Sequence, residues 1–446
     1  MPSVYKGACS AATVRYGLCV TGCALPIDYS GTLRNACIGR FCWLFLSIPS
    51  SPPPNAHMSR QALVTVVTRN YLHYAAALAD SCQRWQPAWE LHVLLADRLP
   101  PDISLPASLS GGNVQLMYGD QLDQIANWQR FAFQYTPFEL SCALKPFAMQ
   151  RVLDQGCEQV TFIDADLALY APLASITQAL QAHSIALIPH LHRPLPRDGR
   201  KPIENNFLNA GTFNGGLLAC RDDAVGRDFL QWWQQHLQRD CYVDVAGGVF
   251  VDQKWLNLVP GLFPSVAIVR QPGCNTGHWT LSQYPLTHDP TQGYRVGDYP
   301  LECFHFSNFL PANPYEFMHS QSRISFSSLP ALEDLVRDYH AQLKRHAAEQ
   351  YSQLGCQFQT LSDGTTIKPE WREAVRRDHK DLRHIANPFD VAAHPNLAGR
   401  LDAAVRRAHK WRGDWRLQLP SEQLKRQHQR RWKNYWRNLK SRWQRS

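Results

Sequence analysis

The segment from Val160 to Asp166 constrains this chain more than any other, because a strand signal runs directly into two closely spaced carboxylates. Residues 160–163 form an apolar, β-branched run that is typical of a buried strand. Asp164 and Asp166 follow at its carboxyl end, and the period of two along a strand predicts that they point the same way. Two anions that close repel each other unless a cation lies between them, and Mg²⁺ or Mn²⁺ takes carboxylate oxygens together with substrate phosphates. The segment therefore predicts a metal-bound, phosphate-bearing substrate at the end of a strand.

Strand and helix signals alternate over about 250 residues from Met58 onward, which predicts an α/β domain. Asn70 is expected to cap the first helix, and Pro146 is expected to break or kink the second. In such sheets ligands bind outside the carboxyl ends of the strands, where Asp164 and Asp166 would lie. The predicted strands are 62–68, 91–95, 160–163, 185–188 and 217–220, and the predicted helices are 71–84, 138–153 and 229–237.

Composition divides the chain into four predicted parts. The prolines and serines of residues 49–55 interrupt regular structure just before the regular pattern begins, so we expect 1–57 to be a dispensable extension, disordered or a start-site artefact. The longest apolar run, Phe41 to Ile48, is shorter than the roughly 20 residues of a membrane-spanning helix. The four parts are the extension 1–57, the α/β domain 58–320, a helical or irregular extension 321–400 and a basic tail 401–446.

The thirteen cysteines give no spacing typical of a metal or disulfide site. Five lie in the first 57 residues and eight are scattered singly afterwards, with no C-x-x-C pair and no Cys/His block of zinc-finger spacing. Free buried thiols in a reducing compartment are therefore expected, which favours a cytoplasmic location.

Three further motifs each have an ordinary structural explanation when taken singly. The Gly/Asn-rich segment Asn209–Gly216 could let backbone approach a sugar or phosphate, or could be only a bulge or tight turn. Asp252 and Gln253 stand at a predicted helix start, where the carboxylate would serve as an N-cap. His305 lies in an aromatic run and could be a buried core histidine.

Taken together and in this order, the motifs resemble the GT-A-fold glycosyltransferases of the family 8 type. This group includes the glycogenins and the bacterial lipopolysaccharide galactosyl- and glucosyltransferases. The resemblance covers roughly Leu63 to Pro314 and implies a Rossmann-like, mostly parallel sheet flanked by helices. It rests on Ala143-Leu144-Lys145-Pro146, Phe162-Ile163-Asp164-Ala165-Asp166, Phe213-Asn214-Gly215-Gly216, Asp252-Gln253 with Leu256-Asn257, and His305-Phe306-Ser307.

The resemblance implies a donor site for a nucleotide-sugar, expected to be a UDP-sugar, with Mn²⁺ or Mg²⁺ as cofactor. It makes Asp164, Asp166 and His305 the metal ligands. Asp252 and Gln253 would lie near the anomeric carbon as the catalytic residues. The remaining residues that the resemblance assigns to nucleotide-sugar binding, beside the two aspartates, are Lys145, Ala165, Asn214, Gly215 and Gly216.

The activity implied by the resemblance is sugar transfer with retention of anomeric configuration to a saccharide or to an envelope or lipid-linked acceptor. Retention requires either a carboxylate nucleophile or attack on the leaving-group side with the diphosphate as base, and both remain open. One departure concerns Ser307-Asn308-Phe309, which stands where family members often carry a Gly and a Lys-Pro-Trp. A diphosphate-binding lysine is therefore not expected there. The Pro/Arg-rich segment 190–201 is either a loop over the acceptor side or an ordinary solvent loop.

Two other enzyme classes share parts of this pattern. A haloacid-dehalogenase-type phosphatase needs Thr or Val two residues after the second Asp, where this chain has Ala168. A nucleotidyltransferase shares the sheet and the metal, but its glycine-rich phosphate loop is missing near the first strand. A nucleotidyltransferase acting on sugar phosphates is the enzymatic alternative. A sugar- or membrane-binding protein without catalysis is the non-enzymatic one.

The tail carries the positive charge of the chain. Residues 401–446 hold 14 Lys and Arg against 3 Asp and Glu, so the net charge of +9 leaves −2 for the rest. Trp432, Trp436, Leu439 and Trp443 would share one helical face. The tail could bind nucleic acid, lie on an anionic membrane surface, or dock on the body or a partner. Because bacterial sugar transferases often act on envelope acceptors, peripheral association with the inner face of the plasma membrane is favoured over nucleic acid.

Overall fold

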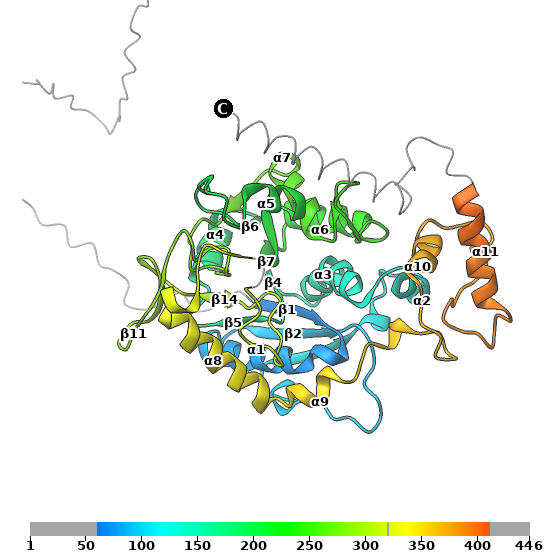
Figure 1. Cartoon of the computed structure of the whole chain (residues 1–446), viewed down its shortest axis with the longest axis horizontal. Helices are drawn as coiled ribbons and strands as arrows, with labels where there is room; N and C mark the ends of the chain where they lie inside the picture. Colours follow the sequence, from blue (N-terminus) through cyan, green and yellow to red (C-terminus); the bar gives the residue numbers. More distant parts are fainter. Residues whose placement is uncertain (1–59, 319–320, 411–446) are drawn as a thin grey trace, which may run out of the picture. The chain divides into compact units, whose positions relative to one another are not determined.

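A central seven-stranded sheet organises the computed structural model, which describes residues 60–318 and 321–410. Its strands are β1 (Gln61–Val67), β2 (Glu90–Leu95), β3 (Val114–Tyr118), β4 (Gln159–Ile163), β6 (Ile185–Pro189), β7 (Phe213–Arg221) and β10 (Val266–Ile268). They lie in the order β10-β6-β7-β4-β1-β2-β3, of which Figure 1 labels β6, β7, β4, β1 and β2. Strands β1 to β4 are mutually parallel, as are β6 and β10, whereas β7 runs antiparallel to both β4 and β6. The predicted α/β class with a mostly parallel central sheet is confirmed.

Helices cover both faces of this sheet (Figure 1). The alternation along β1 shows the two cores, because Val64 and Val66 pack into one and Leu63 and Val67 into the other. Strands buried on both faces explain the continuous apolar runs of the sequence. On the first side lie α2 (Trp128–Phe133), α3 (Pro137–Asp154), α6 (Ala224–Leu237), α10 (Pro369–Arg376) and α11 (Leu397–Lys410). On the second side lie α1 (Leu72–Trp85), α4 (Ala174–Ala182), α8 (Pro330–Arg345) and α9 (Ala348–Ser352).

Short strands outside the main sheet complete the fold. One pair matters most for the site: β5 (Leu167–Leu169) follows β4 directly and pairs antiparallel with β14 (Cys303–His305), which sets His305 opposite Leu167. The others are β8 (Val243–Asp244) with β9 (Val249–Phe250), and β11 (Leu286–Asp289) with β12 (Gly293–Val296) and β13 (Tyr299–Pro300). The remaining helices are α5 (Glu204–Ala210), α7 (Val259–Leu262) and 3-10 turns at Arg69–Tyr71, Ala107–Leu109, Gly119–Gln121, Gln253–Leu258, Phe326–Ser328 and Gln357–Gln359.

Two local predictions about helices are wrong. Asn70 does not cap α1; it lies inside the 3-10 turn Arg69–Tyr71, and its side-chain oxygen accepts a hydrogen bond from Thr68 Oγ1 at 2.7 Å. The predicted break at Pro146 does not occur, because α3 runs through it to Asp154, and a kink there stays a prediction. A capping box between Thr136 and Glu139 fixes the start of α3, and burial of the helix against β1 and α6 offsets the hydrogen bond that a proline removes.

The cysteines and the ends of the chain are also the subject of predictions. The eight cysteines within the described residues are free and buried, as expected. Across 60–318 and 321–410, we find no helix long and apolar enough to span a bilayer. The predicted extension 1–57 and the predicted Trp face at 432–443 lie outside the described residues.

A buried histidine on α1 predicts an acid-sensitive fold. His73 is 1% exposed, and within the described residues neither ring nitrogen has a hydrogen-bond partner. Burial, helped by the charge of His346, lowers the pKa of His73 from 6.5 to about 4. Below about pH 6.5 the unfolded chain therefore binds a proton at His73, whereas the folded chain does not bind it until about pH 4. The free energy of unfolding should fall by about 3 kcal/mol across that interval.

His73→Leu removes this titration. In urea denaturation across this interval, the variant should lose less stability than wild type as the pH falls. Parallel pH profiles for the two proteins would contradict the assignment.

Candidate active site

The two aspartates lie in a turn and not on the strand. β4 ends at Ile163, and residues 164–166 turn the chain into β5, with Leu167 N–H donating to the carbonyl of Asp164 at 3.1 Å. The predicted alternation of side chains along a strand is therefore not what orients the carboxylates. Asp164 N–H donates to Gly216 O of the neighbouring strand at 2.8 Å, which fixes the start of this turn. Ala165, between the carboxylates, turns its methyl group into the core behind them.

His305 reaches the aspartates through the pairing of β5 with β14. Its Nε2 lies 3.2 Å from Asp166 Oδ1, and the ligand atoms of Asp164, Asp166 and His305 all lie within 4.8 Å of one another. Although burial opposes it, the negative charge of Asp166 raises the pKa of His305. Burial likewise works against ionisation of Asp166, yet the charge and hydrogen bond of His305 lower the pKa of that carboxyl.

Asn275 orients this histidine and was missed by sequence reasoning. Nδ1–H of His305 donates to Asn275 Oδ1 at 3.2 Å, and Asn275 is 2% exposed. A cation at the site would displace the Nε2 proton that faces Asp166, and Asn275 would keep the remaining proton on Nδ1, so that the Nε2 lone pair points to the ion. Asn275 has a φ of 62°, a left-handed conformation in which Asn is several-fold enriched. An isolated Asn offers no sequence signal for this role.

The residues present fit a divalent cation. The donors are two carboxylate oxygens and one imidazole nitrogen, a mixed set that suits Mn²⁺ or Mg²⁺ more than a thiolate-seeking metal. The space beside them is kept clear by Gly216, where an added Cβ would lie 2.5 Å from His305 Cε1 and 2.7 Å from Asp164 Oδ2. Asp164, Asp166 and His305 are therefore the residues that could hold a metal ion at this end of the sheet.

Lys145 places a positive charge beneath the aspartates. It comes from α3, is 4% exposed, and its Nζ lies 3.2 Å from Asp164 Oδ1 and 3.1 Å from Asp252 Oδ2. The ammonium also donates to Gly215 O at 2.9 Å and lies 4.7 Å from the centre of the Phe162 ring. Although burial opposes it, these two carboxylates raise the pKa of Lys145, so it is a fixed cation at neutral pH.

Asn214, Gly215 and Gly216 lie inside β7, so the predicted turn before a strand is instead the first part of the strand itself. Gly215 N–H donates to Gln253 Oε1 at 2.9 Å, while Gly216 N–H donates to Asn214 Oδ1 at 2.7 Å. The other side of the Gln253 amide donates to Ala210 O at 3.1 Å. These bonds hold the amides of Asn214 and Gln253 in fixed orientations next to the aspartates.

Asp252 does not act as the predicted helix cap. It precedes the 3-10 turn Gln253–Leu258, but within the described residues its side chain makes no capping bond. Its carboxylate faces Lys145 instead, and its carbonyl accepts from Trp233 Nε1 at 3.2 Å. With 1% of its surface exposed, Asp252 is a buried anion beside the site.

His190, at the start of the segment 190–201, also belongs to this group. Asn214 Nδ2 donates to His190 Nε2 at 3.0 Å, so the ring carries its proton on Nδ1. Burial, and then the charge of His305, lower the pKa of His190 to about 3, which keeps the ring neutral. The rest of the segment is an irregular loop held by Arg323, which donates to the carbonyls of Pro196, Arg200 and Pro202 at 2.9–3.0 Å. The sequence predicts that segment 190–201 is a loop, but it carries no signal for the contact between His190 and Asn214.

A methyl group at Gly216 should displace the site without unfolding the protein. In Gly216→Ala, the ends of His305, Asp164 and Asn214 would each have to move, because an added Cβ lies within 2.8 Å of all three. A displacement of about 1 Å can cost on the order of 100-fold in rate. We expect that loss in turnover at an unchanged melting temperature. The matched control is Gly261→Ala, since a Cβ there meets nothing within 4 Å; equal activity of the two variants would contradict the assignment.

Comparison with known proteins places the chain beside two bacterial sequences. No family model matches it. It is 27% identical over 212 residues to the uncharacterized protein YfnF of Bacillus subtilis (strain 168). The aligned region covers 47% of this chain and 69% of YfnF. It is 24% identical over 183 residues to the uncharacterized protein YfnD of the same organism, spanning 40% of this chain and 56% of YfnD.

Three solved structures are similar to the chain at low TM-scores. An active-site mutant of LgtC aligns with a TM-score of 0.36 and 16% identity over 55% of this chain and 86% of LgtC. The galactosyltransferase LgtC in complex with donor and acceptor sugar analogs aligns with a TM-score of 0.36 and 14% identity. The alignment covers 70% of this chain and 99% of LgtC. The bifunctional glycosyltransferase WbbM aligns with a TM-score of 0.40 and 13% identity. The alignment covers 68% of this chain and 53% of WbbM.

Proposed function

We propose that this protein is a metal-dependent glycosyltransferase that moves a sugar from a nucleotide-sugar to a saccharide or to an envelope or lipid-linked acceptor. The observation that carries the proposal is the meeting of Asp164, Asp166 and His305 beside Lys145, at the carboxyl end of β4. That edge of a mostly parallel sheet is where ligands bind in α/β folds. The order of motifs that resembles family 8 supports the same function.

The charged side chains would act on the leaving diphosphate. When bound, Mn²⁺ or Mg²⁺ would neutralise the charge that develops as the glycosyl–phosphate bond breaks. Asp164, Asp166 and His305 would hold the ion, with Asn275 keeping the imidazole in the required tautomer. Lys145 adds a fixed positive charge in a buried setting, where electrostatic stabilisation is stronger than in water.

Asp252, Gln253 and Asn214 would act on the sugar. The bond from the anomeric carbon to the diphosphate oxygen breaks, a bond to the acceptor oxygen forms, and the acceptor proton passes to the diphosphate or to a carboxylate. The buried charge of Asp252 and the fixed amide of Gln253 would stabilise the oxocarbenium-like sugar. We propose retention of configuration, by either of the two routes that retention allows.

A panel of nucleotide-sugars tests this function. With Mn²⁺ present, the protein should hydrolyse one donor slowly, releasing a nucleoside diphosphate and the sugar in its original anomeric form, as read by NMR. A chelator in excess should stop the reaction, and added Mn²⁺ should restore it. Cleavage of no donor in the panel, or full turnover in the chelator, would overturn the proposal.

The nucleotidyltransferase alternative predicts different products. That enzyme would consume a nucleoside triphosphate and a sugar phosphate, and it would release pyrophosphate. Incubating the protein with both pairs of substrates and separating the products distinguishes the two reactions.

The organisation of the rest of the chain remains part of the proposal. We propose that 58–320 is the catalytic domain and that 401–446 attaches the protein to an anionic membrane surface, where an envelope acceptor would be found. The first ten residues of this tail belong to the core helix α11 (Leu397–Lys410). Flotation with anionic liposomes, with and without residues 411–446, therefore tests the attachment. Tight binding of the tail to RNA without binding to liposomes would contradict it.

A further inference from the structure

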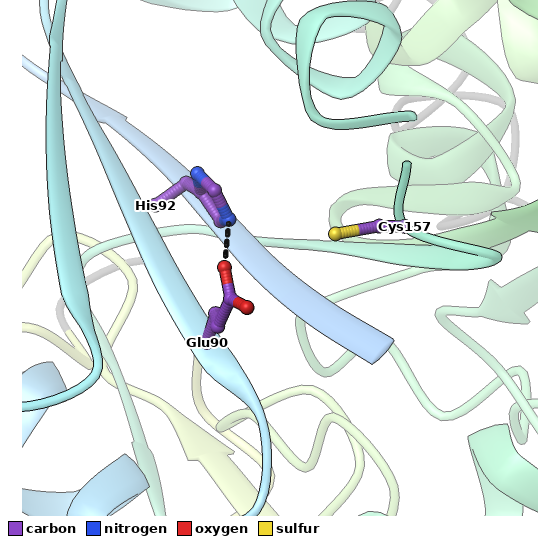
Figure 2. Close-up of side chains that lie close together, drawn as sticks. All are labelled: Glu90, His92 and Cys157. Carbon is purple, nitrogen blue, oxygen red and sulfur yellow. Dashed lines mark ion pairs between the residues drawn. The ribbon is translucent and has the colours of Figure 1, made fainter. Parts of the chain in front are cut away.

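Three side chains with metal-ligand chemistry meet at the opposite end of the sheet. Glu90 opens β2, His92 follows two residues later on the same strand, and Cys157 stands just before β4 (Figure 2). Their ligand atoms lie within 4.8 Å of one another, and the sulfur of Cys157 is turned toward the His92–Glu90 pair. Since β4 separates Cys157 from Asp164, the two groups lie about 20 Å apart along the strand. This cluster is therefore independent of the proposed transferase site.

His92 is the member that needs an explanation. It is 2% exposed, and neither of its ring nitrogens has a hydrogen-bond partner among residues 60–318 and 321–410. Leaving a buried polar group unsatisfied costs about 1–3 kcal/mol. Nε2 of this ring forms an ion pair with Glu90 Oε2 at 3.3 Å, and Oε2 also accepts from Arg60 at 3.0 Å. A cation bound here would engage the Nε2 lone pair and a remaining lone pair of Oε2.

The separation and the donor types suit one metal. Two ligands of a tetrahedral Zn²⁺ site, one nitrogen and one oxygen at about 2.1 Å from the metal, stand about 3.4 Å apart. The distance of 3.3 Å from His92 Nε2 to Glu90 Oε2 agrees with this geometry. A thiolate, an imidazole and a carboxylate form a set that Zn²⁺ accepts and that Mg²⁺ or Ca²⁺ does not.

Arg60 supports the carboxylate from outside. Its guanidinium donates to both oxygens of Glu90 at 2.9–3.1 Å, so the carboxylate has a fixed orientation. Such hydrogen bonds to a ligating carboxylate are the usual outer shell of a metal site. The side chain of Glu90 is 29% exposed, which gives an ion and a water molecule access, whereas Cys157 is fully buried.

We propose that Glu90, His92 and Cys157 bind Zn²⁺ as a structural site that fastens β2 to the segment leading into β4. Glu90 supplies an oxygen, His92 supplies Nε2, Cys157 supplies its sulfur, and water takes the fourth position. The Cys157 thiol releases its proton to solvent as the zinc–sulfur bond forms, and no redox change is involved. The two negative ligands balance the charge of the ion.

X-ray absorption of the full-length protein tests the site directly. The protein is stripped with a chelator and reloaded with two equivalents of Zn²⁺, so that both this cluster and the group of Asp164, Asp166 and His305 can be filled. We expect a sulfur neighbour at about 2.3 Å from the zinc, together with nitrogen and oxygen at about 2.0–2.2 Å. A shell of nitrogen and oxygen alone in the wild-type protein would overturn the proposal, whatever the variants do.

Variants identify the sulfur. Cys157→Ser should lose the sulfur neighbour and bind Zn²⁺ at least tenfold more weakly. Cys82→Ser, a control at another buried free cysteine, should keep both properties. Survival of the sulfur neighbour in Cys157→Ser would overturn the assignment. Because Zn²⁺ would bind only the folded chain, it should also raise the melting temperature of wild type more than that of Glu90→Gln.

Discussion

Asp166→Ala is expected to abolish metal-dependent sugar transfer while the protein stays folded, and Asp164→Ala and His305→Ala should do the same. The three side chains supply the donors of one site, in which His305 Nε2 lies 3.2 Å from Asp166 Oδ1. Loss of several kcal/mol of charge stabilisation by the ion corresponds to about 1000-fold or more in rate. The side chain of Asp166 is 26% exposed, so its removal buries no new unpaired charge.

Three measurements check this expectation: turnover of the preferred donor, Mn²⁺ affinity by calorimetry and the melting temperature. Asp123→Ala is the matched control, since this side chain is 88% exposed and pairs with Arg151 and not with a residue of the site. Activity and Mn²⁺ binding in the control should equal those of wild type. A variant at Asp164, Asp166 or His305 that binds Mn²⁺ normally would show that the ion is held elsewhere.

Lys145→Met should damage both stability and donor binding. Lys145 is buried between two carboxylates, and removing it leaves Asp252 and Asp164 without their nearest positive charge. Breaking a buried ion pair in this way typically costs 3–5 kcal/mol. Asp166 is partly exposed, whereas Lys145 is buried, so this residue couples the fold to the site.

A second variant separates the two effects. In Lys145→Met with Asp252→Asn, the buried charge of Asp252 is gone, so urea denaturation should show that part of the lost stability returns. Nucleotide-sugar binding should stay lost, because the positive charge beneath the donor site is still absent. A single variant as stable as wild type would show that the ion pairs at Lys145 contribute little.

Much of the sheet could be predicted because its strands are buried on both faces. Continuous apolar runs marked β1, β2, β4, β6 and the later part of β7 within a few residues. The direction of β7 could not be read from its residues, since an antiparallel strand buried on both faces carries the same apolar run as a parallel one. Asn70 and Asp252 show the limit of capping rules: each stands before a helix, yet each side chain has a stronger local partner, Thr68 in one case and Lys145 in the other.

The candidate site was predicted from the order of motifs, and no single spacing identifies it. Asp166 and His305 are far apart in sequence, and only the β5–β14 pairing brings them together. Asn275 and His190 carry no local pattern, so their contacts with His305 and Asn214 needed coordinates. The cluster of Glu90, His92 and Cys157 could not be predicted for the same reason, because different strands bring these residues together and no zinc-finger spacing marks them.

The pairing of β5 with β14 has a consequence for how the protein is made. It closes a loop of about 140 residues, and the entropy of that closure costs about 4 kcal/mol for three residues of pairing on each side. A chain emerging from the ribosome can build β1 to β4 with both aspartates long before residue 305 exists. The ion-binding group is thus completed late in synthesis, and a chain that ends before β14 carries the sheet without a finished site.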